Sequence, residues 1–353
     1  MDLDEKLKLV MKPPTEEVVT AEELRQLFET VSRPGHYIGF EISGLLHLGS
    51  LVVAGFKLRD LNGAGVRTRV FLADWHSVIN EKLGGNWERI RAAADYYREA
   101  FHEFCPGTEF VLGSDLYHCN DEYWKDMIRF SKHVSFKRAS RTLSIMGRTM
   151  KEALDIASYL YPSMQGVDIH HLGADIAHAG MDQRKVHMLA REVYPKIGWK
   201  PPIALHHHLL LGLQGPSRAG LEEDEKADMA IGSKMSKSKP WTCIFIHDDL
   251  STIGKKLEKA WCPEGETEFN PVLELVKYIV FHEFKEFRVE RPARYGGEVA
   301  FATYEELEKA YAAKTVHPMD LKAATARYID GIVGSLRAKF ESRRQRLEEL
   351  MRE

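Results

Sequence analysis

The chain has 353 residues, of which 44% are hydrophobic and 29% are charged, as in ordinary globular proteins. This length predicts a sizeable core and two domains. The formal net charge of −3 excludes wholesale non-specific binding to nucleic acids, so any such contact must come from local basic patches.

The N-terminal region predicts a protein that is neither exported nor inserted into a membrane. Its first residues are mostly charged, and no uninterrupted apolar run in the chain reaches the length of a membrane span. A helix is predicted at 20–31, where Thr20 and Glu23 form a capping box and apolar residues follow at helical spacing. We interpret this helix as core packing.

The stretch at 37–50 predicts a strand that runs directly into a helix. Gly39 and Gly44 let the backbone approach a ligand closely, while His47 and Gly49 fall in the first helical turn. That turn offers unpaired N–H groups and the positive end of the helix dipole, which suit a nucleotide phosphate. The alternative is an ordinary turn without a ligand.

The next segments alternate between strand and helix. Strands are predicted at 67–73 and 109–113, with a helix at about 87–104 between them, and this order is typical of a parallel α/β sheet. The first of these strands ends at Asp74-Trp75-His76, a polar cluster at the edge where open α/β sheets place ligands.

From 120 to 160 the pattern is helical and rich in basic residues. These residues form either a solvated face or an RNA contact. They are Lys132, Lys137, Arg138, Arg141, Arg148 and Lys151. Two dense polar stretches follow at 161–171 and 180–185, and polar residues of this density in apolar surroundings indicate the wall of a pocket.

Several histidines invite a metal interpretation, but their spacing does not support it. No H-E-x-x-H motif is present, and nearby aspartates complete no recognisable ligand pattern. The histidines are His170, His171, His178, His187 and the run His206-His207-His208. The four cysteines are dispersed without a C-x-x-C pair, so we predict no protein-bound metal, no disulfide framework and a cytoplasmic location.

A lysine-rich segment follows a loop of mixed glycine, proline and acidic residues. Lys234, Lys237 and Lys239 alternate with small hydroxyl residues, an arrangement suited to closing over a polyphosphate whose charge shifts during a reaction. The alternative is an exposed basic loop. Beyond residue 248 strands give way to helices, predicted at 251–261, at 272–281, after Thr303 and from 320 onwards.

Two of these motifs together resemble the signatures of class I aminoacyl-tRNA synthetases. Lys234-Met235-Ser236-Lys237-Ser238 looks like one signature, and His47-Leu48-Gly49 looks like the first positions of the other. Within the class, nearly the whole chain resembles tyrosyl-tRNA synthetases of archaeal and eukaryotic type. The similar segments are 37–49, 71–76, 161–168, 180–185 and 317–320.

The resemblance implies an α/β fold and two domains with different functions. A Rossmann-like parallel-sheet catalytic domain is expected at 1–245, with a helical insertion at about 115–160. A mostly α-helical anticodon-binding domain is expected at 246–353. The implied partners are L-tyrosine, ATP with Mg²⁺, tRNA(Tyr) and a second copy of the chain in a homodimer, with no DNA and no membrane.

The resemblance also implies roles for individual residues. Tyr37 and Asp168 match the residues that hold the phenolic hydroxyl of tyrosine, and Tyr161, Gln165 and Gln183 match those around its ammonium group. The catalytic residues are expected to be His47, Lys234 and Lys237. ATP binding is expected to involve Gly39, Glu41, His47, Gly49, Ser50, Met235, Ser236 and Lys237. Contacts with tRNA are expected at Tyr295 and Asp320, for the anticodon, and at Lys137 and Arg138.

Two departures and two alternatives accompany this interpretation. Ser50 stands where the first signature usually has a histidine, and Ile42 replaces a proline common in archaeal relatives.

A tryptophanyl-tRNA synthetase would share the class and both signatures, but an indole N–H offers no acceptor to a hydroxyl donor such as Tyr37. A catalytically silent homologue would retain only the fold. Intact His47 and Lys234 argue against it.

Overall fold

The computed structural model describes residues 1–147, 155–220 and 224–351, which form two compact units. Unit 1 comprises Met1–Gly44, Ala54–His208 and Leu347–Glu353. Unit 2 comprises Leu45–Val53 and Leu209–Arg346. The stretch at 37–50 therefore contributes to both units. Residues 209 to 245 belong to unit 2 by their contacts, together with the later part of the chain. The predicted boundary between two domains at 245/246 stays a prediction.

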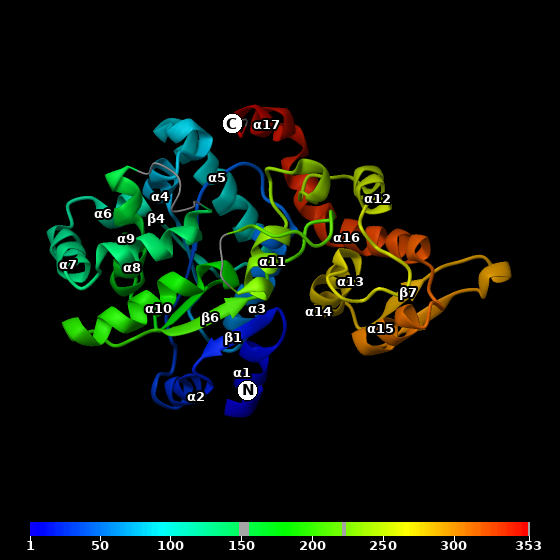
Figure 1. The fold of residues 1–353 in the computed structure, drawn as a ribbon, viewed down its shortest axis with the longest axis horizontal. Helices are drawn as coiled ribbons and strands as arrows, with labels where there is room; N and C mark the ends of the chain where they lie inside the picture. The colour runs from blue at the N-terminus through cyan, green and yellow to red at the C-terminus, as the bar shows by residue number, and fades with distance from the viewer. Residues whose placement is uncertain (148–154, 221–223, 352–353) are drawn as a thin grey trace. The chain divides into compact units, whose positions relative to one another are not determined.

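Unit 1 contains a sheet and the helices α1 to α10 (Figure 1). Its main elements are α1 (Leu3–Met11), β1 (Thr15–Val19), α2 (Ala21–Thr30), β2 (His36–Phe40), α3 (Ala54–Gly63), β3 (Arg69–Leu72), α4 (Asp74–Ile79), α5 (Trp87–Phe104), β4 (Glu109–Leu112), α6 (Gly113–Tyr117), α7 (Asp121–Ser131), α8 (Phe136–Thr142), η3 (Leu143–Met146), α9 (Ile156–His171), β5 (Ile176–Gly180), η4 (Met181–Gln183), α10 (Arg184–Val193), η5 (Tyr194–Ile197) and β6 (Ile203–His207).

Unit 2 is mostly helical. Its main elements are η1 (Leu48–Val53), α11 (Glu225–Ser233), η6 (Pro240–Thr242), α12 (Leu250–Glu258), α13 (Pro271–Leu275), η7 (Val276–Val280), α14 (Phe281–Glu283), β7 (Phe287–Val289), η8 (Ala293–Tyr295), β8 (Val299–Phe301), α15 (Tyr304–Ala312), α16 (Pro318–Phe340) and η9 (Glu341–Arg343). The last helix, α17 (Arg344–Leu350), begins in unit 2 and ends in unit 1.

The sheet of unit 1 has six strands in the order β1-β6-β5-β2-β3-β4. All neighbouring pairs are parallel except β1 and β6. The chain moves outward from β2 to β3 and β4, and then returns to the other side of β2 to form β5 and β6. The switch point of the topology therefore lies between β2 and β5, where open α/β sheets bind ligands beyond the carboxyl ends of the strands.

The sheet is covered on both faces, as a parallel sheet requires. Apolar residues of α1, α2 and α3 pack on one face, and those of α7, α9 and α10 pack on the other. Side chains alternate along each strand, so Ile176 belongs to the first core and its neighbour Ala177 to the second. The predicted α/β fold with a parallel sheet is confirmed.

The local predictions agree with the structure at most helix starts. Thr20 and Glu23 form the predicted capping box at the start of α2, through two hydrogen bonds of 3.1 Å. The hairpin of β7 and β8 was missed, because strands of three residues are too short to show an alternating pattern.

In the predicted insertion, Arg148 and Lys151 lie outside the described residues. Within the described ranges, no helix combines the length and apolar character needed to cross a membrane.

Four of the histidines that invited a metal interpretation, His178, His187, His206 and His207, are buried and each lies within 3.0 Å of another histidine ring. His178 of β5 lies between His36 of β2, 3.0 Å from it, and His207 of β6, 2.8 Å from it. A second pair joins His187 to His206 at 3.0 Å, and His206 also contacts Glu17 at 2.8 Å. Each of these buried rings thus has at least one nitrogen in contact with a protein partner, while Nε2 of His187 has none among the residues that the structure describes.

These buried imidazoles make the protein sensitive to acid. Burial lowers the pKa of His36 to about 3 and that of His207 to about 4. Such a ring binds a proton only after unfolding, so the free energy of unfolding falls as pH drops below the ordinary histidine value of about 6.5. We expect each ring to cost about 2 kcal/mol between about pH 6.5 and pH 5, measured by urea unfolding.

His207→Gln removes one titrating ring and should reduce this loss. His102→Gln, a change at an exposed histidine of α5, is the matched control and should leave the pH dependence unchanged. Equal pH dependence in both variants would contradict the assignment.

Candidate active site

A group of polar side chains lies at the switch point of the sheet in unit 1, and we refer to this group as the pocket. Tyr37 lies on β2, His76 follows the carboxyl end of β3, and Tyr117 follows that of β4. Gln183 lies in η4, directly after β5. The carboxyl ends of adjacent parallel strands share one edge of a sheet, which explains why residues so distant in sequence come together here.

Asp168 of α9 is the buried acid of this pocket. Its side chain has no exposed surface, and its Oδ1 atom accepts hydrogen bonds from the hydroxyls of Tyr123, at 2.8 Å, and Tyr117, at 3.0 Å. Its Oδ2 atom lies 3.5 Å from Nε2 of His76 without forming a hydrogen bond. One oxygen of the carboxyl group is therefore occupied by two donors and the other by none.

Other buried polar atoms of this site also lack a hydrogen-bond partner among the residues that the structure describes. They are both ring nitrogens of His76, whose Nε2 lies 3.5 Å from Oδ2, and Oε1 of Gln165. Such atoms are costly in a folded protein, and they are common where a polar ligand binds. The pocket can therefore take a small ligand that carries a hydroxyl group.

The electrostatics of the pocket are dominated by burial. Burial raises the pKa of Asp168 to about 8, while the hydrogen bonds from Tyr123 and Tyr117 act in the opposite direction. Burial lowers the pKa of His76 to about 3, so this ring is neutral and its contact with Asp168 is not an ion pair. Burial, followed by the nearby charge of Asp168, raises the pKa of Tyr37 well above its ordinary range.

A second polar group in unit 1 centres on Glu41. Its Oε1 atom accepts hydrogen bonds from the hydroxyl of Tyr161, at 2.8 Å, and from the amide of Asn80, at 2.9 Å. Lys82 lies 3.7 Å from Oε2. Glu41 was predicted at the ATP site, and the structure joins it directly to a residue predicted to hold the amino-acid substrate.

The two glutamines are also brought together. Nε2 of Gln165 lies 3.5 Å from Oε1 of Gln183, whose own amide donates to the carbonyl of Ile145 at 3.0 Å. Gly39 has a local role as well, because a Cβ atom there would lie 2.5 Å from the hydroxyl of Tyr37. The absent side chain gives the phenol of Tyr37 its place in the pocket.

In unit 2, backbone pairing joins the two signature segments to one framework. Leu48 N–H donates to the carbonyl of Ile244 at 3.1 Å, and Met235 N–H donates to that of Leu210 at 2.7 Å. Lys234 forms an isolated bridge with Leu211. His47 and the segment from Lys234 to Ser238 are thereby both anchored to residues between 209 and 246.

His47 is a neutral donor in this framework. Its Nδ1 atom accepts a hydrogen bond from Gly49 N–H at 3.2 Å, so the ring proton is placed on Nε2. Burial, and then the charges of Lys237 and Lys234, lower the pKa of His47 to about 3. A Cβ atom on residue 49 would lie 3.2 Å from Cε1 of this ring, which explains the glycine.

Ser50 has a clear role in holding His47. Its hydroxyl accepts from His47 N–H at 2.9 Å and donates to the His47 carbonyl at 3.1 Å. The helix begins as the π-helix η1, and the expectation of unpaired N–H groups in its first turn is wrong. Gly49, Ser50 and Leu51 all donate within this turn, because the wider turn folds back on His47.

The residues predicted to bind tRNA lie on separate elements. Lys137 and Arg138 are in α8, and Arg138 lies 3.1 Å from Glu192, whereas Lys137 is exposed. In unit 2, Tyr295 is the last residue of η8 and Asp320 is in the first turn of α16. Asp320 is partly exposed, as a residue that reads a base must be.

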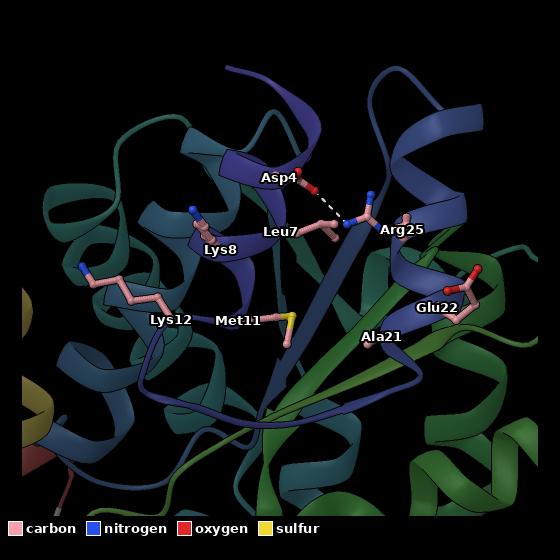
Figure 2. A pocket seen from close by; sticks show the side chains of 8 residues that line it. All are labelled: Asp4, Leu7, Lys8, Met11, Lys12, Ala21, Glu22 and Arg25. Carbon is pink, nitrogen blue, oxygen red and sulfur yellow. Dashed lines mark hydrogen bonds and ion pairs between the residues drawn. The ribbon is translucent and has the colours of Figure 1, made fainter.

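Neither a metal cluster nor the hollow between α1 and α2 contributes to the site among the described residues. No cluster of three or more histidine, cysteine or acidic side chains able to hold a metal ion occurs among the residues that the structure describes. A hollow of about 570 Å³ opens between α1 and α2 (Figure 2), and it includes none of the predicted site residues. Its Arg25 is already paired with Asp4 at 2.7 Å.

Sequence reasoning missed Tyr117 and Tyr123, the partners of Asp168. Both lie where the helical pattern was interpreted only as an insertion. The position of Tyr117 just beyond the carboxyl end of β4 was the available signal, since Asp74 and His76 beyond β3 were recognised by the same rule.

Comparison with known proteins places this geometry in a family. The sequence matches the model of the tRNA synthetases class I (W and Y) over residues 31–334. Tyrosine–tRNA ligase of Pyrococcus furiosus is 48% identical over 367 residues, which cover 99% of this chain and 98% of that protein. The structure is similar to that of tyrosyl-tRNA synthetase complexed with L-tyrosine from Pyrococcus horikoshii, with a TM-score of 0.92, 47% identity and 99% of both chains covered. The corresponding structure from Archaeoglobus fulgidus has a TM-score of 0.85 and 38% identity, and covers 96% of this chain and 99% of that one.

Replacing Asp168 with asparagine is expected to stabilise the protein more at about pH 8.5 than at about pH 5. The folded chain holds the Asp168 proton up to a pKa of about 8, whereas the unfolded chain loses it near pH 4. The free energy of unfolding of the unmodified protein therefore falls through this window, and asparagine does not titrate. Urea unfolding at both pH values measures the difference.

Asp249→Asn is the control, because a hydrogen bond with Thr252 lowers the pKa of Asp249. This variant should show no gain that grows with pH. An equal gain for Asp168→Asn at both pH values would contradict the titration assigned to this carboxyl group.

Proposed function

This chain belongs to the class I tRNA synthetases of the tryptophan and tyrosine group, and within this family we propose that it is a tyrosine–tRNA ligase. The enzyme activates L-tyrosine with ATP, giving tyrosyl-adenylate and pyrophosphate. It then transfers the tyrosyl group to the 3′-terminal ribose of tRNA(Tyr). Both steps are displacements at a phosphate or an acyl carbon, and neither needs a covalent bond to the protein.

The observation that carries the choice of tyrosine is the unpaired Oδ2 of Asp168. A phenolic hydroxyl can donate to this buried oxygen, while the hydroxyl of Tyr37 lies on the same pocket wall. Phenylalanine would leave these groups unpaired, and a buried acceptor without its donor costs about 1–3 kcal/mol or more. Hydroxyl recognition therefore selects tyrosine.

The ammonium end of the substrate is assigned to Gln165 and Gln183, together with the polar group around Glu41. Gln165 Oε1 has no protein partner and accepts hydrogen bonds only, which suits an ammonium group. Glu41 holds the Tyr161 hydroxyl in a fixed position beside this group. Gln183 completes the set through its contact with Gln165.

The phosphates of ATP are assigned to unit 2. His47 supplies a directional Nε2–H donor, and Lys234 and Lys237 supply positive charge to the phosphate oxygens as pyrophosphate leaves. Catalysis then rests on positioning and electrostatics. Magnesium would enter with ATP as part of the co-substrate. Gly49 and Ser50, which were predicted at the ATP site, act in this assignment as supports of His47.

Two observations favour tyrosine over the alternatives. An indole N–H can donate to Asp168 but has no acceptor for the hydroxyl of Tyr37, which argues against tryptophan. A silent homologue would have no need to keep buried polar atoms unpaired around Asp168, because unpaired atoms cost stability.

The same proposal includes tRNA, a second copy of the chain and a cytoplasmic location. Asp320 and Tyr295 are assigned to the anticodon, and Lys137 and Arg138 to another part of the tRNA. A homodimer is supported by exposed apolar side chains on α7, α8 and α9. They are Ile128, Phe136 and Ile156, with 66%, 70% and 82% exposure.

Pyrophosphate exchange into ATP tests the function directly. Tyrosine, tryptophan and phenylalanine are supplied separately to the purified chain. We expect exchange with tyrosine, and exchange weaker by at least about a hundredfold with the other two. Exchange with tryptophan alone would refute the substrate, and no exchange with any amino acid would favour a silent homologue.

A second test separates the anticodon contact from the chemistry. Asp320→Ala should reduce tRNA charging at least about tenfold while exchange is unchanged, because the carboxylate contacts only the tRNA. Glu305→Ala removes an acid from the first turn of α15 and is the matched control for helix stability. A fall in exchange, or equal charging by the two variants, would contradict the assignment of Asp320.

A further inference from the structure

Tyr117 and Tyr123 bind Asp168 from two different helices, and neither residue has a role in the function described so far. We propose that they are positioning residues: they hold Asp168 so that Oδ2 alone faces the substrate hydroxyl, and thereby set the discrimination between tyrosine and phenylalanine. This role rests on the proposed function and concerns the selectivity of the same site.

The geometry fixes the carboxyl group in one orientation. Asp168 lies on α9, Tyr117 on α6 and Tyr123 on α7, so three elements meet at Oδ1. Partial rotation of the carboxyl group about its Cβ–Cγ bond would stretch both hydrogen bonds, of 2.8 and 3.0 Å. The remaining oxygen is therefore presented in a constant position.

The two phenols are themselves held firmly. Their ring centroids lie 4.7 Å apart, and the Tyr117 ring packs edge-on against Trp75 at 5.2 Å. The Tyr123 ring packs edge-on against Trp124 at 5.3 Å. Both tyrosines are buried, so their hydroxyls do not exchange Asp168 for water. Aromatic packing thus fixes the donors before any substrate binds.

The groups facing Asp168 explain why these donors are needed. His76 and Asp74 face it from α4, Tyr37 from β2, Tyr161 from α9 itself and Tyr194 from η5. None of these five is a cation, since His76 is neutral, and Asp74 opposes the ionisation of Asp168. The hydroxyls of Tyr117 and Tyr123 are the groups that favour the charged carboxylate.

The charge state matters because a carboxylate is a stronger acceptor than a carboxylic acid. Hydrogen bonds to an ionised acceptor are roughly twice as strong as those between neutral groups. Loss of either tyrosine hydroxyl should raise the pKa of Asp168 further above its value of about 8, so that the carboxyl group stays protonated to a higher pH. A substrate hydroxyl then gains less, and phenylalanine is rejected less strongly.

The test measures the ratio of kcat/KM for tyrosine to that for phenylalanine in pyrophosphate exchange. Tyr117→Phe, Tyr123→Phe and the double variant are compared with the unmodified protein between about pH 6.5 and pH 9.5. Steps that involve only ATP affect both kcat/KM values equally, so they do not change the ratio. Tyr194→Phe is the matched control, because its buried hydroxyl donates to the carbonyl of Gly166 at 2.7 Å instead of to Asp168.

At about pH 9, above the pKa of about 8 that Asp168 has in the unmodified protein, we expect the ratio to fall about tenfold to a hundredfold in Tyr123→Phe, and further in the double variant. The KM for ATP should stay unchanged. The ratio should recover as pH rises, with a midpoint above that of the unmodified protein. Tyr194→Phe should retain the original ratio and midpoint even if it is less stable.

Three results would overturn the role. They are an unchanged ratio in both single variants, a ratio that falls equally in Tyr194→Phe, and a loss that is the same at every pH. If Tyr123→Phe does not fold, Tyr117→Phe carries the same test through the longer hydrogen bond. Failure of the proposed function is distinct, because the unmodified protein would then show no tyrosine-dependent exchange, and the positioning role would fall with it.

Discussion

The burial of one carboxyl group is the constraint on which the amino-acid pocket depends. Asp168 has no exposed surface, and a group of this kind is tolerated only where donors reach it. The topology of the sheet brings these donors to Asp168. The helices α6 and α7, which carry Tyr117 and Tyr123, follow β4, and α4 follows β3, so all three begin at the edge of the sheet where α9 also lies. The donors satisfy Oδ1 and leave Oδ2 to a ligand. In the proposed function, selectivity for a hydroxyl and the cost of burying a carboxyl group are therefore two aspects of one arrangement.

In the proposed function, unit 2 has a different task, which is to stabilise phosphate charge without neutralising its own cations. Burial and two neighbouring lysines keep His47 uncharged, so the ring acts as a directional donor while the lysines provide charge. Ser50 fits this arrangement, because its hydroxyl binds both backbone groups of His47. A serine at this position strengthens the support of the first histidine, whereas a second imidazole would act on the ligand itself.

The sequence predicted the class of fold and the family because its signals are local. Capping boxes, alternating strands and the segment from Lys234 to Ser238 can each be recognised within a few residues. The partners of Asp168 could not be found in this way, since their proximity depends on how α6 and α7 pack on α9. The π-helical turn after His47 was equally hidden, because its hydrogen bonds depend on Ser50 and on the backbone of Ile244. The histidine pairs needed strand register, which brings His36, His178 and His207 into line across three strands.

A crystal structure of this chain with L-tyrosine bound tests the central claim most directly. The account predicts that the phenolic oxygen lies within hydrogen-bonding distance of Asp168 Oδ2, while Tyr117 and Tyr123 remain on Oδ1. A phenolic oxygen on Oδ1 in place of either tyrosine, or an amino acid bound away from Asp168, would contradict it.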